Sequence, residues 1–433
     1  MDRHYLSTIK MYVISGVLCG VICGGSCIAF AWATTLCDNT FQANHWLLFL
    51  LPVSGIAVVL LYDFFRSGED LATDAIFKFS HKGNSNGYDE SDSVSPWLAP
   101  LIFISTCLAY LTGGSCGRVG SALQIGGCLS AVICRRFSGA AGLRSVYIAC
   151  GMAAGFTAIL NAPVAGAVFG VELLILSGWD LMIVFPALLS SFITWGISKL
   201  AHVPYTDFHN GFSGGITDAG STSDDAAMAA VLHTGLDASI IWRVVVIAAF
   251  ATIAGRLFCY GRLAFNAGFE LMGNKIVRVL VGTGLVIGIT LLIGTYDFNG
   301  LGFGYVDKVL DGNSAMFAFA FKLVLTCLTL GCGIRGGEIS PVIFIGATSC
   351  FALGCLIGLD PTLAAALGIV GTLGSVTNTP IAIMIYGLEA IECSGEMVIY
   401  FAITALIAHL CSGTYGLYHQ QHAENQILKP RIP

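Results

Sequence analysis

A short segment occurs twice in the sequence, and each copy ends with a glutamate. NAPVAGAVFGVE (residues 161–172) returns as NTPIAIMIYGLE (residues 378–389), and the copies share Asn161/Asn378, Pro163/Pro380 and Glu172/Glu389. Asn is a good helix cap and Pro suits the first helical position, so each copy predicts a turn that opens a short helix ending at glutamate. Because the carboxylates occur at matching places, we expect both to satisfy backbone groups or to pair with a cation, rather than to act on a solute.

A second repeated feature is a pair of glycine-rich turns upstream. GGSCGRVGSALQIGG contains Arg118 and Gly120, and at the same offset GCGIRGGEISPVIFIGA contains Arg335 and Gly337. The start of a helix carries free N–H donors and about half a positive charge, and glycine lets a ligand approach that backbone. Several such turns that meet would bind an anion without a fixed cation, which would hold the anion too tightly for fast passage.

The elements that must position these turns are membrane helices. The chain of 433 residues is 56% hydrophobic and 11% charged, with a mean hydropathy of +0.81, whereas a soluble domain has about 25% charged residues. We therefore predict an all-α, multi-pass protein of the plasma membrane, embedded in the lipid bilayer. Apolar runs, several of them long enough to cross a bilayer, occupy residues 11–36, 46–62, 97–111, 179–200, 240–260, 276–293, 316–330 and 397–411.

The repeats divide the chain into related halves. We expect one membrane domain over residues 1–433, with a first repeat at 60–200, a polar connecting region at 201–239 and a second repeat at 240–420. Internal repeats of transporters often pack in opposite orientations, which brings broken helices together near the middle of the membrane. The residues after Cys411 are too few for a cytoplasmic regulatory domain, so we expect none.

Composition argues against several other classes of protein. The polar loops at 81–96 and 207–225 are not basic, so we expect no nucleic-acid partner. Sixteen cysteines include no CxxC pair, and the four-residue spacing of Cys19, Cys23 and Cys27 favours close helix packing over a metal site. The sequence indicates no cofactor. An intramembrane enzyme that uses Glu172 or Glu389 is disfavoured because neither HExxH nor a nucleophile elbow occurs.

Five motifs in a fixed order carry a family resemblance. GGSCGRVGSALQIGG, NAPVAGAVFGVE, GGEISPVIFIGA, NTPIAIMIYGLE and GTYGLYHQQ resemble the CLC chloride channel and transporter family, from about residue 16 to 421. The resemblance implies a CLC fold of two inverted repeats with about eighteen tilted or broken helices in each subunit. It also implies a homodimer with one pore per subunit, which conducts halide anions as voltage-gated chloride channels do.

One motif points to a branch of the family. GGEISP, with Glu338 where most of the family has an apolar residue, is similar to the fluoride-exporting CLC-F branch. The usual Gly-Ser-Gly-Ile-Pro signature is absent, and the equivalent turn is RSGEDLATD, which contains Gly68, Glu69 and Asp70. Fluoride and chloride both remain candidate substrates. Glu69 and Asp70 are expected to be exposed or to cap a helix.

The position of the family's gating glutamate holds valine. Proton-coupled members carry Gly-Arg-Glu-Gly, whereas this chain reads Gly117-Arg118-Val119-Gly120. Valine carries no proton, and SSFITWGISKLAHV offers no carboxylate where chloride antiporters keep an internal one. We therefore predict passive halide transport with Val119 at the gate position. The alternative is a proton-coupled fluoride antiporter that uses Glu338.

The resemblance assigns an anion pathway, and several members have a second interpretation. Arg118 either holds its loop or attracts anions, and Glu338 either serves the pathway or caps its own helix. Ser340 donates to a halide or bonds to backbone, and Tyr418 donates to the anion or anchors the membrane interface. The assigned residues are Gly68, Gly117, Arg118, Val119, Gly120, Ser121, Gly337, Glu338, Ile339, Ser340 and Tyr418.

Overall fold

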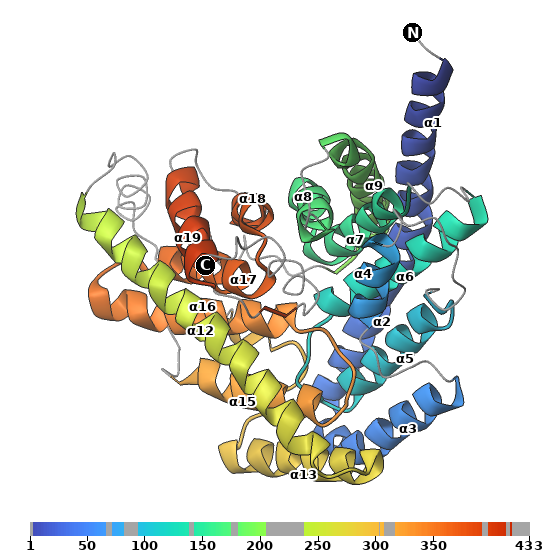
Figure 1. The fold of residues 1–433 in the computed structure, drawn as a ribbon. Coiled ribbons are helices and arrows are strands. Elements are labelled where there is room, and N and C mark those ends of the chain that lie inside the picture. Colours follow the sequence, from blue (N-terminus) through green and yellow to red (C-terminus); the bar gives the residue numbers. More distant parts are fainter. Residues whose placement is uncertain are drawn as a thin grey trace, which may run out of the picture.

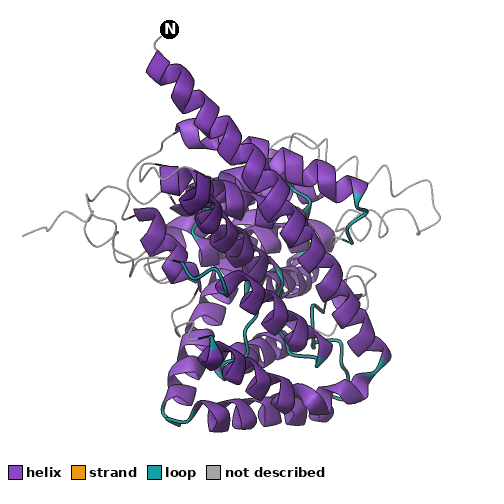
Figure 2. Ribbon diagram, turned by 90° about the vertical axis from the view of Figure 1, so that its right-hand side faces the viewer, coloured by secondary structure: helices purple, strands orange, loops and turns teal. Residues whose placement is uncertain are grey.

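The structure is a computed structural model that describes residues 3–65, 72–81, 94–137, 143–174, 181–204, 238–302, 304–306, 317–391, 397–412 and 416–417. These residues form helices joined by loops (Figures 1 and 2). Gly117 and Gly337 form one isolated antiparallel bridge within the described ranges. The described helices confirm the predicted all-α class. Most of the predicted connecting region at 201–239 lies outside the described residues.

The helices follow one another along the whole chain. In order they are α1 (Arg3–Leu18), a π-helical turn (Cys19–Cys23), α2 (Gly24–Ala43), a 3₁₀ helix (His45–Leu50), α3 (Leu51–Phe64), α4 (Ala72–His81), α5 (Leu98–Leu111), α6 (Val119–Phe137), α7 (Arg144–Leu160), α8 (Pro163–Leu174), α9 (Leu181–Leu200), α12 (Ala238–Glu270), α13 (Lys275–Ile293), α15 (Ala318–Gly331), α16 (Ile339–Ile357), α17 (Pro361–Thr377), α18 (Pro380–Ile391) and α19 (Met397–Cys411).

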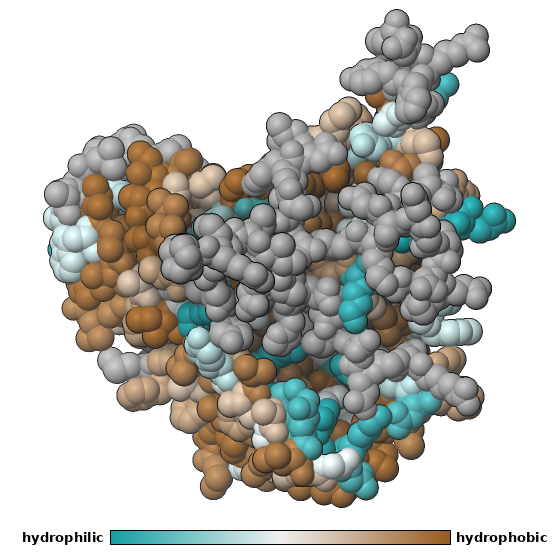
Figure 3. Space-filling model, viewed as in Figure 1, coloured by the Kyte–Doolittle hydropathy of each residue, from teal (hydrophilic) through white to brown (hydrophobic). Residues whose placement is uncertain are grey.

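Length separates helices that can cross a membrane from helices that cannot. Six helical segments in the described ranges are long and apolar enough to span it, whereas α8 and α18 have 12 residues each and reach only part of the way. Hydrophobic side chains cover wide areas of the surface in Figure 3. The spanning segments are Thr8–Ala43, His45–Phe64, Met182–Leu200, Ser239–Glu270, Lys275–Ile293 and Ile339–Ile357.

Two runs of four helices repeat each other in length. Helices α5 and α15 have 14 residues each, α6 and α16 have 19, α7 and α17 have 17, and α8 and α18 have 12. Because α6 opens at Val119 and α16 at Ile339, Gly117 corresponds to Gly337 and Arg118 to Glu338. The expected match of Arg118 with Arg335 was therefore wrong by three residues. The reason is that the connection from α6 to α7 is three residues longer than the connection from α16 to α17.

Glycines set how closely the repeated helices approach. A Cβ on Gly151 of α7 would overlap the carbonyl oxygen of Gly126 on α6, and a Cβ on Gly368 of α17 would overlap that of Gly346 on α16. Only glycine allows backbones to touch in this way. The equivalent crossings bury α7 and α17 along nearly their whole length.

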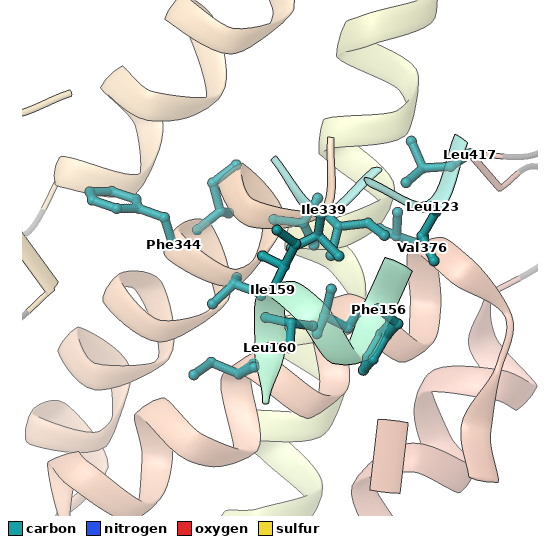
Figure 4. Packing of buried hydrophobic residues seen from close by; sticks show 14 of the residues in the cluster. Leu123, Phe156, Ile159, Leu160, Ile339, Phe344, Val376 and Leu417 are labelled. Atoms are coloured by element: carbon teal, nitrogen blue, oxygen red, sulfur yellow. The ribbon is translucent and has the colours of Figure 1, made fainter. Parts of the chain in front are cut away.

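The interior between the halves is apolar. Figure 4 shows part of this cluster, where side chains from α6, α7, α16 and α17 meet. Phe156 of α7 also contacts Tyr386 of α18 edge to face, with ring centroids 5.8 Å apart. The first residues of α6 and α16 therefore sit at the border between this apolar interior and the polar loops that precede them.

Candidate functional site

The two glycine turns meet directly. The N–H of Gly117 donates to the carbonyl of Gly337 over 2.6 Å, and the N–H of Gly337 donates to that of Gly117 over 2.7 Å. A Cβ on Gly337 would lie 2.8 Å from the Gly120 nitrogen, so the contact excludes a side chain. We call Gly117, Gly120 and Gly337 the glycine junction. Since α6 begins at Val119 and α16 at Ile339, both helix N-termini face this junction from opposite sides.

Arg118 is fixed away from open solvent. Only 3% of the residue is exposed, and its guanidinium donates to Thr35 Oγ1 over 2.8 Å and to the Pro204 carbonyl over 3.2 Å. Its backbone N–H donates to Ser340 Oγ over 3.3 Å. The Arg118 side chain therefore ties the first glycine turn to α2, and the Ser340 hydroxyl bonds to backbone across the junction.

Apolar residues occupy the first position of both helices. Val119 is 1% exposed and Ile339 is 2% exposed. Figure 4 shows Ile339 next to the packed side chains of the interior, and Val119 belongs to the same hydrophobic cluster. Neither position offers a charge to an anion.

Glu338 precedes α16 and forms an ion pair with another helix. Its Oε1 lies 2.6 Å from Nε of Arg262 on α12, and the two side chains are 16% and 21% exposed. No hydrogen bond joins the Glu338 side chain to the start of its own helix, so the capping interpretation was wrong. No sequence motif pointed to Arg262, although an arginine within a long apolar helix is a signal of function in membranes.

A cavity of about 440 Å³ opens onto the glycine junction. Gly120, Ser121, Gly337, Glu338 and Ile339 line it, whereas Gly117, Arg118, Val119 and Ser340 are not among its lining residues. Its wall carries one more cation than acids, and two of the cations form ion pairs with two of the acids. The cations are Arg262, Lys275, Arg278 and Arg335, and the acids are Asp63, Glu270 and Glu338.

Contacts hold three of these cations at the wall. Lys275 Nζ lies 3.0 Å from Asp63 Oδ1, Arg278 Nε donates to the Cys332 carbonyl over 3.1 Å, and the Arg335 guanidinium lies 5.1 Å from the ring centre of Tyr62.

Four of the residues that the sequence singles out have no described position. Gly68, Tyr418 and the acids Glu69 and Asp70 lie outside the described residues.

The repeated glutamates bond reciprocally across the halves. Glu172 of α8 accepts from the backbone nitrogens of Ile381 and Ala382 at the start of α18, over 3.2 and 2.8 Å. Glu389 of α18 accepts from Val164 and Ala165 at the start of α8, over 3.0 and 2.8 Å. The end of each helix therefore meets the start of the other. These bonds show that the two helices, which are neighbours in Figure 1, run antiparallel to each other, as in an inverted repeat.

The two asparagines do not open these short helices. Asn161 (φ 55°) and Asn378 (φ 57°) adopt the left-handed conformation and end α7 and α17, and their backbone N–H groups bond back to Thr157 and Gly374. The expectation of an N-cap was wrong because asparagine also tolerates the left-handed helix end. Pro163 and Pro380 take the first helical position, as predicted.

The cysteines of the N-terminal segment pack between helices. Cys19, Cys23 and Cys27 are fully buried, and Cys19 Sγ lies 3.7 Å from the Tyr147 carbonyl of α7. In the ranges that the structure describes, no group of three His, Cys, Asp or Glu side chains could hold a metal ion.

Antiparallel helical repeats that join glycine turns beside a cationic cavity define a membrane protein for anion transport. The family described as "Voltage gated chloride channel" matches residues 75–413, and the chain belongs to this family. The family match and the relatives below confirm the resemblance to CLC proteins and to the CLC-F branch.

Curated relatives and solved structures agree with this membership. The chain is 27% identical over 382 residues to a chloride/fluoride channel protein of Pseudomonas syringae pv. tomato, covering 88% of this chain and 79% of that protein. It is 23% identical to the H⁺/Cl⁻ exchange transporter ClcA of Cronobacter sakazakii, covering 96% and 88%.

The fold resembles a CLC-type fluoride/proton antiporter, with a TM-score of 0.81, 22% identity and coverage of 97% and 99%. It also resembles a slow cyanobacterial Cl⁻/H⁺ antiporter, with a TM-score of 0.72, 15% identity and coverage of 96% and 98%. These structural matches confirm the predicted CLC fold.

Proposed function

We propose that this protein carries fluoride and chloride passively across the plasma membrane, without coupling to protons. The observation that carries this proposal is the antiparallel contact of Gly117 with Gly337, which brings two helix N-termini to the edge of a cationic cavity. Helix N-termini bind anions through backbone N–H groups. The buried Val119 supports uncoupled transport because it cannot exchange a proton.

Reconstitution tests substrate and coupling together. Purified protein in liposomes loaded with fluoride or chloride should release either anion when valinomycin and potassium compensate the charge. External pH, recorded at the same time, should stay constant, because no carboxylate occupies the gate position. Proton uptake driven uphill by anion efflux would contradict passive transport, and no efflux of either anion would contradict the proposal altogether.

A proton-coupled fluoride antiporter is the second candidate. The carboxylate of Glu338 supports it, because this side chain lines the cavity, is partly exposed and can exchange a proton with water there. Under this mechanism Glu338→Gln abolishes proton uptake. Asp360→Asn is the matched control: the same carboxylate-to-amide change at the start of α17, where Asn still caps the helix. If Glu338→Gln transports anions as the wild type does, coupling through Glu338 is excluded.

We also propose a homodimer, as the resemblance implies. Large apolar side chains are exposed on α9 and on α19, among them Phe185 (55%), Phe192 (47%) and Leu406 (56%). These surfaces suit burial against lipid or a second copy. Mass photometry of the protein in nanodiscs should give the mass of two chains, and one chain per particle would contradict the dimer.

A further inference from the structure

Three charged side chains gather in the protein interior behind the glycine junction. Lys322 of α15 is fully buried and Arg118 is 3% exposed. Asp38 of α2 lies against the loop that Lys322 binds: a Cβ added to Gly300, whose carbonyl accepts from Lys322, would overlap Asp38 Oδ1, and that oxygen is buried. Asp38 also lies within electrostatic range of Arg118. We call Asp38, Arg118 and Lys322 the buried charge triad. None of the three lines the cavity described above.

Lys322 is held by backbone carbonyls and faces the helix that starts at the junction. Its Nζ donates to the carbonyls of Phe298 and Gly300 over 3.1 and 2.7 Å, and it lies 5.5 Å from the ring centre of Phe344. Phe344 belongs to α16, the helix that starts at Ile339 (Figure 4). Lys322 is also within electrostatic range of Cys116, the neighbour of Gly117.

The carboxylate of the triad does not fully neutralise its cations. Asp38 accepts a hydrogen bond from the Leu301 backbone. Its Oδ1, like Nε of Arg118, has no hydrogen-bond partner in the part of the chain that the structure describes. Two cations and one carboxylate leave one positive charge in an apolar interior. Such a charge acts over a longer range than a charge in water, and salt screens it weakly.

We propose that the buried charge triad supplies the positive potential that draws a halide to the glycine junction, although none of its side chains reaches the cavity. Lys322 and Arg118 are positioning residues that stabilise the anion through space, and Asp38 limits the strength of their field. An anion held in this way stays exchangeable, because no guanidinium or ammonium group binds it directly. This inference rests on the proposed anion transport and adds the source of the attraction.

A purely structural role makes a different prediction. Lys322 ties down the loop that contains Phe298 and Gly300, and Arg118 ties its turn to Thr35. If this were their whole contribution, any substitution in the triad would loosen the junction and weaken anion transport. The electrostatic role instead gives substitutions of opposite charge opposite effects.

The experiment measures initial chloride efflux from proteoliposomes against chloride concentration. Asp38→Asn should lower the apparent KM about three- to tenfold, and Lys322→Met should raise it by a similar factor, as expected for one buried charge. Lys322→Arg keeps the charge and should stay within about twofold of the wild type. Lys10→Met, which removes an exposed cation on α1, is the matched control and should leave the KM unchanged.

Salt provides a second readout. Adding an impermeant salt should leave the ratio of KM values between Lys322→Met and the wild type unchanged, because the charge is buried. If Asp38→Asn and Lys322→Met both raise the KM, or if Lys322→Arg behaves as Lys322→Met, the inference is wrong. Should Asp38→Asn fail to fold, the comparison of Lys322→Met with Lys322→Arg decides. A wild type without anion efflux refutes the proposed function itself, whereas normal efflux without these shifts refutes only the role of the triad.

Discussion

A single methyl group decides whether the glycine junction can close. A Cβ at Gly337 would lie 2.8 Å from the Gly120 nitrogen and 2.9 Å from the Gly117 oxygen, both rigid backbone atoms. Gly337→Ala should therefore cost about 1–3 kcal/mol of stability, as overpacking does, and reduce anion efflux at least about tenfold because both turns must move.

The matched control for this substitution is Gly284→Ala on α13, where no atom lies within 4 Å of the added group. For this variant, the thermal unfolding temperature, monitored by size-exclusion chromatography, and the rate of chloride efflux should both equal those of the wild type. Normal transport by Gly337→Ala would show that the antiparallel contact is not needed for the pathway.

Val119 is the second residue whose side chain leads to a prediction about anion transport. It is 1% exposed at the first position of α6. Val119→Glu should slow chloride efflux several-fold at neutral pH, since an ionised carboxylate at this helix start repels the anion. Lowering the pH protonates that carboxyl group and should restore the rate.

Glutamine is nearly the same size as glutamate but cannot ionise, so anion efflux through Val119→Gln should not depend on pH. Efflux measured between pH 5 and 8 compares the two variants. Equal, pH-independent rates for both would mean that position 119 does not influence the anion path.

At the scale of elements, reciprocal capping joins the two halves. The carboxylate of Glu172 accepts two backbone N–H bonds from α18, and that of Glu389 accepts two from α8. Glu172→Ala should lower the free energy of unfolding by about 1–3 kcal/mol, because it leaves two N–H donors unpaired in an apolar region. Glu389→Ala should cost a similar amount.

Both glutamates join the same pair of helices, so the double variant should cost less than the sum of the single variants. Unfolding in mixed micelles measures all three variants. A loss below about 0.5 kcal/mol for Glu172→Ala would contradict the capping role.

Local sequence signals predicted the elements better than the contacts between them. Apolar runs and the Pro163 and Pro380 turns located helices, because membrane helices follow from composition and proline from its fixed geometry. The match of Gly117 with Gly337 was not predicted. The connection between α6 and α7 is longer than the one between α16 and α17, and this difference becomes visible only when the bounds of the helices are known.

Contacts between distant segments could not be predicted. Arg262 meets Glu338, and Lys322 meets the loop around Gly300, only because α12 and α15 pack beside α16 and α13 packs beside α15. A single sequence gives the charge of such residues and not their neighbours. Both cations were nevertheless detectable as charges inside apolar helices, which are rare without a function.

At the scale of the whole molecule, the site joins the two halves of the chain. Gly117 and Gly337 belong to different halves, and residues from both halves line the cavity beside them. Exposed apolar surface covers wide areas of the exterior instead (Figure 3). We therefore expect association with a second copy to add contact area rather than to supply residues to the junction.

This arrangement predicts independent subunits. Two differently tagged chains, one wild type and one carrying Gly337→Val, can be co-expressed and purified by both tags so that each dimer contains one of each. Because the wild-type chain keeps a complete junction and cavity, the mixed dimer should transport chloride at about half the rate of the wild-type dimer, with an unchanged KM. Dimers of Gly337→Val alone should be inactive, since the larger side chain overlaps the Gly120 backbone even more than alanine would. A mixed dimer with no activity would mean that the pathway depends on both chains, and full activity would mean that the junction is not on the pathway.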